Sequence, residues 1–459
     1  MPRPRTQALC NAALDTAIKR GGHTYASIAA MINDVAAEDG GDLRCTAATL
    51  GKWLNGAVPV PATMAYAVEA FARLLDEPGL TAGDLGWPAG AVTAPQDPWR
   101  GDPVTWLTTL GRSEMLDRRE ALTASLYSLT AAALPDRLHR ITRRAGEPRR
   151  AGTADVARIR ETTRIFGDLD DLYGGGHART ALGAWITHDV APLLHGTTGA
   201  ARPPLFIAAA EAAYLAAYMA SDAGKACLAQ RWYVQAARLA DEAGDPVMRA
   251  SALRGMAVQA IELGHNRAGR DLADAAADGI RTGAPTRTKA WITGMRAEAL
   301  AATSGDSARA RSLLRAAEAD LERADSGAAP LAGAYRRESF EHQVGLTLAQ
   351  LGDLAGTEEH YAASVRSRRT VERRTRALIG ARLAHVQLRR RHPEQAARTL
   401  LDLSDDLGAV ASHRVHTILG QIRAGWSPLR HDPAVADADR LLASLTGPAP
   451  TSPAGIRRT

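Results

Sequence analysis

The sequence predicts an all-α protein in which a small N-terminal helical domain precedes a long helical solenoid. Three observations favour this class. Alanine dominates the 459 residues and runs of β-branched residues are scarce, which favours helices over strands. Apolar residues recur at helical spacing between capping residues and glycines. From about residue 154 onward, similar helix pairs recur along the chain, which is typical of a solenoid.

The first 88 residues are expected to form four or five short helices. Residues 6–20 carry one apolar stripe, and two glycines follow it. Thr24 is expected to cap a second helix over Tyr25–Ala37, and a fourth helix is expected over Ala62–Leu75. The glycine-rich segment between the second and third helices predicts a loop.

The third helix organises this domain. Thr46 is placed to cap it, and Leu50, Trp53 and Leu54 give it one apolar face. The other faces carry small, polar or cationic side chains. Asn55-Gly56 is expected to end the helix, because glycine takes positive φ at helix ends and prolines follow at Pro59 and Pro61.

The segment TAATLGKWLNGAVPVP, preceded by a capped helix bearing Ile28-Ala29, resembles the helix-turn-helix domain of the Xre/Cro-repressor family. The matched positions are Ala29, Leu50, Trp53, Gly56 and the prolines. The connection GGDLRC is longer than the usual tight turn. The resemblance implies binding to double-stranded DNA, as a dimer on two half-sites. The DNA-contacting residues that it implies are Tyr25, Arg44, Thr46, Ala47, Ala48, Thr49, Lys52 and Asn55.

The charge distribution argues against a strong phosphate-binding surface in this domain. The whole chain has a net charge of +6, yet residues 1–88 carry seven basic and nine acidic side chains. The basic runs lie at Arg137–Arg150, Arg366–Arg376 and Arg389–Arg391, where solvated helix faces are the simpler interpretation. Residues 89–153 are expected to be a partly helical, Pro- and Arg-rich linker, with the arginine-rich part as a possible nucleic-acid arm.

Residues 154–445 are expected to form a helical array, followed by a flexible tail over 446–459. Turn positions recur at Gly224, Gly264, Gly305, Gly352 and His392, with spacings of 40, 41, 47 and 40. Each turn is followed by a helix rich in alanine and leucine. This pattern resembles tetratricopeptide repeats, although the period exceeds the usual 34, so longer and irregular helices are expected. YGGGH, at Tyr173–His177, predicts a helix break.

Aromatic residues from successive helices are candidates for a partner or effector surface, with the core between repeats as the more ordinary role. These candidates are Tyr214, Tyr218, Trp232, Trp291 and Tyr335. Residues 217–245 and 173–186 resemble segments of actinobacterial regulators that join an Xre-like domain to a degenerate tetratricopeptide array. Some members of that group are negative regulators of differentiation and antibiotic production, which the resemblance implies only by analogy.

The sequence contains no catalytic constellation, so an enzyme, a cofactor and a bound metal are not expected. GxSxG and HExxH are absent, and the glycine cluster lacks the residues of a phosphate loop. His413 and His416 lie three apart, but packing or exposure explains them more simply than a metal site. Three scattered cysteines indicate reduced thiols in the cytoplasm, and neither a signal peptide nor a membrane span is expected.

These observations predict a sequence-specific DNA-binding transcriptional regulator whose array forms a homodimer, senses a peptide, small-molecule or protein effector, or does both. The resemblance to the actinobacterial regulators implies a repressor by analogy. The main alternative is a protein-interaction adaptor whose N-terminal helices only dock, which would suit their negative charge. The operator, the effector and the sign of regulation are not readable from the residues.

Overall fold

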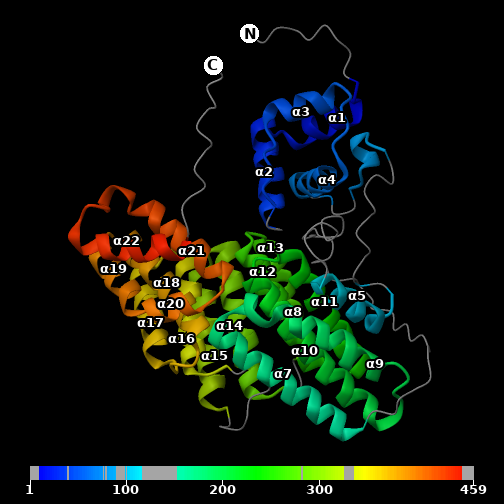
Figure 1. The fold of residues 1–459 in the computed structure, drawn as a ribbon, viewed down its shortest axis with the longest axis vertical. Coiled ribbons are helices and arrows are strands. Elements are labelled where there is room, and N and C mark those ends of the chain that lie inside the picture. The colour runs from blue at the N-terminus through cyan, green and yellow to red at the C-terminus, as the bar shows by residue number, and fades with distance from the viewer. Residues whose placement is uncertain are drawn as a thin grey trace. The chain divides into compact units, whose positions relative to one another are not determined.

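The computed structural model describes residues 10–38, 41–75, 77, 80–88, 99, 101–115, 152–280, 283–324 and 335–446. Within these ranges all regular elements are helices, so the predicted all-α class is confirmed (Figure 1). Two compact units hold the described residues. One draws on Met1–Val156, Thr180–Asp245 and Glu262–Gly264, and the other on Ala157–Arg179, Pro246–Ile261 and His265–Thr459. The domain boundaries expected at residues 88, 153 and 445 stay predictions.

The N-terminal helices share a hydrophobic core of their own, whose members all lie between Leu14 and Trp87. The expected helix ends are confirmed at Gly22, which takes a φ of 65°, and at Gly56, which takes a φ of 95°. Thr24 caps the second helix, since its Oγ1 accepts from the N–H of Ser27 at 3.1 Å. The elements are α1 (Ala12–Gly21), α2 (Tyr25–Glu38), α3 (Ala47–Leu54), α4 (Pro61–Leu75) and the 3-10 turn η1 (Gly83–Leu85).

The first helix begins later than the stripe over residues 6–20 suggests. Asn11 caps α1, because its Oδ1 accepts from the N–H of Leu14 at 3.0 Å. The Nδ2 of the same side chain donates to the carbonyl of Leu85 at 2.9 Å, which joins the start of α1 to η1. One buried amide therefore fixes both ends of the domain. Residues 6–9 of the predicted stripe lie outside the described residues.

Part of the predicted linker is a helix that packs on the array. α5 (Pro103–Met115) contacts the π-helical turn η3 (Ile186–Val190) and α11 (Ala226–Ala243). The contact is close, since a Cβ on Gly111 would lie 2.5 Å from the carbonyl oxygen of Gly183. The arginine-rich run at 137–150 lies outside the described residues. The remaining elements of this region are α7 (Thr153–Tyr173), α8 (Gly175–Trp185), α9 (Ala191–Leu194), η4 (Gly199–Ala201) and α10 (Arg202–Asp222).

Helix pairs follow one another along the rest of the array, as Figure 1 shows from green to orange. This succession confirms the expected solenoid. The elements are α12 (Pro246–Glu262), α13 (Asn266–Gly279), α14 (Thr286–Ser304), α15 (Ser307–Glu322), α16 (Arg337–Gln350), α17 (Leu354–Ser367), α18 (Arg373–Arg389), α19 (Pro393–Asp402), α20 (Ser404–Ala409), α21 (His413–Gly425), η5 (Ser427–Leu429) and α22 (Pro433–Thr446).

The turns within the pairs share one geometry. The four expected glycines all take positive φ, with values of 72°, 83°, 63° and 78° in chain order. The fifth turn was expected at His392, but the left-handed residue there is Arg391, with a φ of 66°, and His392 is the N-cap of α19. The prediction was one residue late because only glycine signals this conformation in a sequence.

The two helices of the α14–α15 pair differ in burial. In α14, buried residues occur all around the helix, whereas only Ala310, Leu314 and Ala317 are buried on α15. α10 is buried on most of its sides, as α14 is. The stretch Gly199–Asp222 is long and apolar enough to cross a membrane by length and composition, but 72% of its most apolar window is buried in the fold. It is a core helix.

α7 packs against the C-terminal part of the array through contacts between residues that are far apart in the sequence. Arg374 on α18 donates from Nε to Asp170 at 3.0 Å and from Nη2 to Asp171 at 3.1 Å. The N–H of Ala411 donates to the carbonyl of Tyr173 at 2.8 Å. Gly174 fits there with a φ of 84°, which confirms the helix break expected in YGGGH. We call this set of contacts the α7 clasp.

Candidate functional site

The outward face of α3 is the first candidate site. A reciprocal capping box starts the helix: Oγ1 of Thr46 accepts from the N–H of Thr49 at 3.4 Å, and Oγ1 of Thr49 accepts from the N–H of Thr46 at 3.2 Å. Leu50 and Trp53 turn inward, and the Trp53 ring meets that of Trp87 edge-on at 5.6 Å between centroids. The helix is therefore held rigidly with its other side outward.

The structure places most of the predicted DNA-contacting residues on that outward side. Thr49 and Tyr25 are half-buried, and the Thr49 hydroxyl is engaged with Thr46. Tyr25 packs against the domain core. The remaining six side chains are exposed to solvent. They are Arg44, Thr46, Ala47, Ala48, Lys52 and Asn55.

An asparagine clamp fixes the long connection that leads into α3. Asn33 on α2 donates from Nδ2 to the carbonyl of Cys45 at 3.0 Å and accepts at Oδ1 from the N–H of Cys45 at 2.7 Å. Burial raises the pKa of the Cys45 thiol, which keeps it protonated. Sequence reasoning missed this clamp. Its only signal in the sequence is Asn33, a polar residue next to the buried Ile32 of α2.

The chemistry of the α3 face is mixed. Lys52 is the basic residue of α3. Just before the helix, Arg44 lies 3.7 Å from Asp42, and the side chains of Arg44 and Asp42 are largely exposed. In the loop after α3, Val58 and Val60 expose 53% and 66% of their surface. Exposed valines beside small side chains suit a protein contact, whereas phosphate binding requires more positive charge.

The aromatic candidates on the array divide by burial. Trp232 is completely buried, and Trp291 and Tyr335 are nearly so, which places these three in the core. The guanidinium of Arg254 stacks over the Trp291 ring at 4.2 Å. Burial raises the pKa of Tyr335 above its ordinary range, so its hydroxyl stays neutral. Tyr214 and Tyr218 are half-buried.

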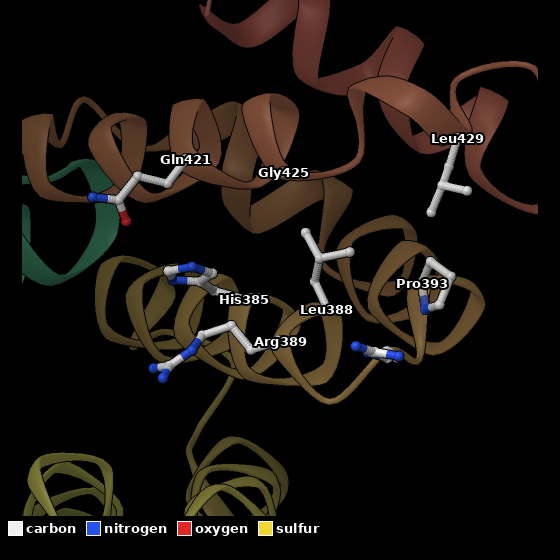
Figure 2. A pocket seen from close by; sticks show the side chains of 8 residues that line it. His385, Leu388, Arg389, Pro393, Gln421, Gly425 and Leu429 are labelled. Atoms are coloured by element: carbon white, nitrogen blue, oxygen red, sulfur yellow. The ribbon is translucent and has the colours of Figure 1, made fainter. Parts of the chain in front are cut away.

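A second candidate site, which sequence reasoning missed, is an open cavity of about 510 Å³ between α18 and α21. We call it the α18–α21 pocket. Figure 2 shows His385 and Leu388 of α18 facing the space below Gln421 of α21. Its lining residues are His385, Leu388, Arg389, Arg391, Pro393, Gln421, Gly425 and Leu429. The sequence marked Arg389–Arg391 only as a basic run, because the opposing wall comes from residues about 30 positions away.

Arginine side chains lie close to two histidines in this part of the array. Burial and the charge of Arg389 lower the pKa of His385, so the imidazole is neutral at pH 7. The imidazole of His342 on α16 lies 2.7 Å from Nη1 of Arg382. Burial lowers its pKa well below the usual value, and the charges of Arg382, Arg368, Arg414 and Arg254 lower it further. No aspartate or glutamate lines the pocket.

The basic run at 366–376 has a different role from the solvated face expected of it. Arg374 and Arg368 are almost fully buried and are held by carboxylates, including Asp170 and Glu372. Arg366 and Arg369 are exposed. Within the described residues, no group of three or more histidine, cysteine, aspartate or glutamate side chains is arranged to hold a metal ion.

Comparison with known proteins gives two matches. The family described as the SP15 N-terminal domain matches residues 14–88, which coincide with the core of the N-terminal domain. A solved structure, "Crystal Structure of Rap Protein Complexed with Competence and Sporulation Factor", aligns with a TM-score of 0.39 and 13% identity over 75% of this chain and 96% of that chain. A likeness this distant supports no functional argument. The search of curated proteins gives no significant match.

Proposed function

We propose that this protein is a regulatory adaptor whose tetratricopeptide-like array binds a segment of a partner protein or a peptide. The observation that supports this function most is the α18–α21 pocket, which joins apolar walls to positive charge without a lining carboxylate. A cavity of about 510 Å³ is within the size range of ligand sites. Solenoids bind extended partners in the same way, on surfaces that successive helices build together.

Cross-linking of the full chain tests this function. The protein is bound to partners from its own cells, treated with a non-selective diazirine cross-linker, and the linked residues are mapped by mass spectrometry. We expect links from the partner to residues 246–446. Links confined to residues 12–87 would contradict an adaptor that binds through its array.

The second candidate function is transcriptional regulation, with α3 reading DNA in a homodimer. The observation that favours it is the outward side of α3, where a rigidly capped helix exposes Ala47, Ala48, Lys52 and Asn55. In this function the array would supply the dimer contact or bind the effector. Effector binding changes DNA affinity only when the effector binds one conformation of the protein more tightly than another.

Replacing Lys52 by alanine tests the DNA-binding candidate. We expect weaker binding to genomic fragments and a salt dependence that is smaller by about one unit, because one phosphate contact is lost. Lys19→Ala is the control, since Lys19 is also an exposed lysine but lies on α1, where it pairs with Asp15 at 2.6 Å. If wild type, Lys52→Ala and Lys19→Ala bind DNA equally well, α3 is not the helix that reads DNA.

Both candidates place the protein in the cytoplasm, with reduced thiols. Cys10, Cys45 and Cys227 form no disulfide, and Cys45 and Cys227 are buried. Reduced cysteines are typical of cytoplasmic proteins.

A further inference from the structure

The turn between α18 and α19 departs from the turns of the other helix pairs at one residue. Its backbone hydrogen bonds are the same: the N–H of His392 donates to the carbonyl of Gln387 at 2.9 Å, as the N–H of Asp353 donates to Leu348 at 3.0 Å. In the α16–α17 turn the left-handed residue is Gly352, but here it is Arg391. Among the described residues, Arg391 is the non-glycine residue with positive φ.

An arginine at this position carries a conformational cost that glycine avoids. The left-handed region brings Cβ close to the following carbonyl in every residue except glycine. Residues held in sparsely populated regions concentrate at functional sites, where another interaction makes the conformation useful. The fold itself needs only the turn, which glycine makes in the other pairs. The arginine side chain is therefore the feature to explain.

The Arg391 side chain lines the α18–α21 pocket together with Arg389. Neither of these two arginines forms an ion pair with any residue that the structure describes, whereas the intervening Arg390 pairs with Glu358. Arginine guanidinium groups bind carboxylates through paired N–H donors. Both side chains are exposed to solvent at the rim of the cavity. Two guanidinium groups that lack a carboxylate partner at one open cavity are suited to bind an anionic ligand.

The rest of the lining narrows the class of ligand. Figure 2 shows Leu388, Pro393 and Leu429 around the same space, which gives the pocket an apolar wall. The Gln421 amide can donate and accept, as a peptide backbone requires. The lining holds no phenylalanine, tyrosine or tryptophan, and its single aromatic ring is the imidazole of His385, so its aliphatic side chains favour a peptide over single-stranded nucleic acid. An acidic group beside an aliphatic group fits all of these features.

We propose that the α18–α21 pocket binds an acidic peptide segment of a partner protein. A carboxylate of the segment pairs with Arg389 and Arg391, and an adjacent aliphatic side chain packs on Leu388, Pro393 and Leu429. Arg391 keeps its left-handed conformation because it presents its guanidinium to this segment. This inference rests on the proposed adaptor function and names the chemistry of its partner.

Fluorescence anisotropy on the full chain tests the proposal. The probe is a peptide of alternating glutamate and leucine with an uncharged dye. Arg389→Gln combined with Arg391→Gln is expected to weaken binding by about a hundredfold, since each lost charge-assisted contact changes affinity by about tenfold or more. The control, Arg366→Gln with Arg398→Gln, removes the same charge from two sites on α17 and α19 that are exposed like Arg389 and Arg391 but lie outside the pocket lining, and it is expected to bind as wild type. Equal weakening by both pairs would overturn the pocket assignment, because the loss of affinity would then follow from the lower net charge of the protein and not from the position of the arginines.

Two control peptides test the two halves of the ligand. An alternating glutamine–leucine peptide lacks the charge, and an alternating glutamate–serine peptide lacks the aliphatic side chains. Both are expected to bind at least tenfold more weakly than the probe. If the glutamate–serine peptide or duplex DNA binds the pocket as tightly as the probe, the ligand is a general polyanion and the proposal is wrong.

Arg391→Gly separates binding from folding. Glycine suits the left-handed position, so amide hydrogen exchange across α18 and α19 is expected to slow. Affinity for the probe is expected to fall about tenfold in the same variant. A variant that is more stable and binds as wild type would overturn the role of Arg391. The partner could also cross-link elsewhere on the array while the probe binds the Arg389 and Arg391 variants as tightly as wild type. That pair of results would support the adaptor function and reject this pocket as its binding site.

Discussion

Replacing Arg374 by alanine is expected to destabilise the C-terminal part of the array by about 3–5 kcal/mol, because it leaves Asp170 buried without its cation. The side chains of Arg374 and Asp170 expose only 4% and 3% of their surface, so solvent does little to compensate. The same change removes the side-chain part of the α7 clasp. Chemical denaturation of the full chain, followed by hydrogen exchange in α7 and α18, measures the loss.

The double variant Asp170→Leu with Arg374→Met controls for this result. It removes both charges together, and buried ion pairs are often replaced by apolar residues at little cost. We therefore expect most of the lost stability to return. If Arg374→Ala alone is as stable as wild type, the α7 clasp is not a buried ion pair in solution.

Replacing Trp53 by alanine is expected to destabilise the N-terminal domain by about 3–5 kcal/mol. The side chain is 4% exposed, and its loss removes the edge-on contact with Trp87. Because Trp53 anchors α3 to the core, hydrogen exchange in α3 should accelerate together with exchange in α1, α2 and α4. The measurement is made on the full chain.

Lys52→Ala is the control for Trp53→Ala. It lies one position away on the same helix, but its side chain is exposed, and surface changes of this kind stay within about 0.5 kcal/mol. If the two variants exchange at the same rate in α3, the Trp53 side chain does not hold the helix to the core.

Local signals predicted the helices and their turns. Thr46 with Gly56 bounds α3, and Gly224, Gly264 and Gly352 mark turns because only glycine takes the left-handed conformation without strain. Periodicity also separated the buried Trp53 from the exposed Lys52. These inferences succeed because capping, turn geometry and amphipathic spacing depend on residues a few positions apart.

Long-range pairing could not be predicted. The clasp joins Asp170 to Arg374, and no local pattern relates residues about 200 positions apart. The left-handed conformation of Arg391 could not be predicted, because in the sequence this residue is one arginine within a basic run. The burial of the aromatic candidates could not be predicted either. Trp232 and Tyr218 come from adjacent helices with similar sequence patterns, and only the packing in the structure shows that Trp232 is fully buried.

The clasp and the pocket share structural elements. α18 contributes Arg374 to the clasp and Arg389 to the pocket, and Ala411 lies just before α21, which carries Gln421. Because α18 and α21 contribute to both, a ligand whose affinity for the pocket depends on the α7 clasp would change the stability of the clasp by the same coupling free energy. α7 directly follows the segment that leads from the N-terminal domain.

Hydrogen exchange on the full chain, with and without a captured partner, tests the adaptor function most directly. We expect the partner to slow exchange in α18, in the turn at Arg391 and in α21, while residues 12–87 exchange as before. Protection confined to residues 12–87, with α18 and α21 unchanged, would contradict it.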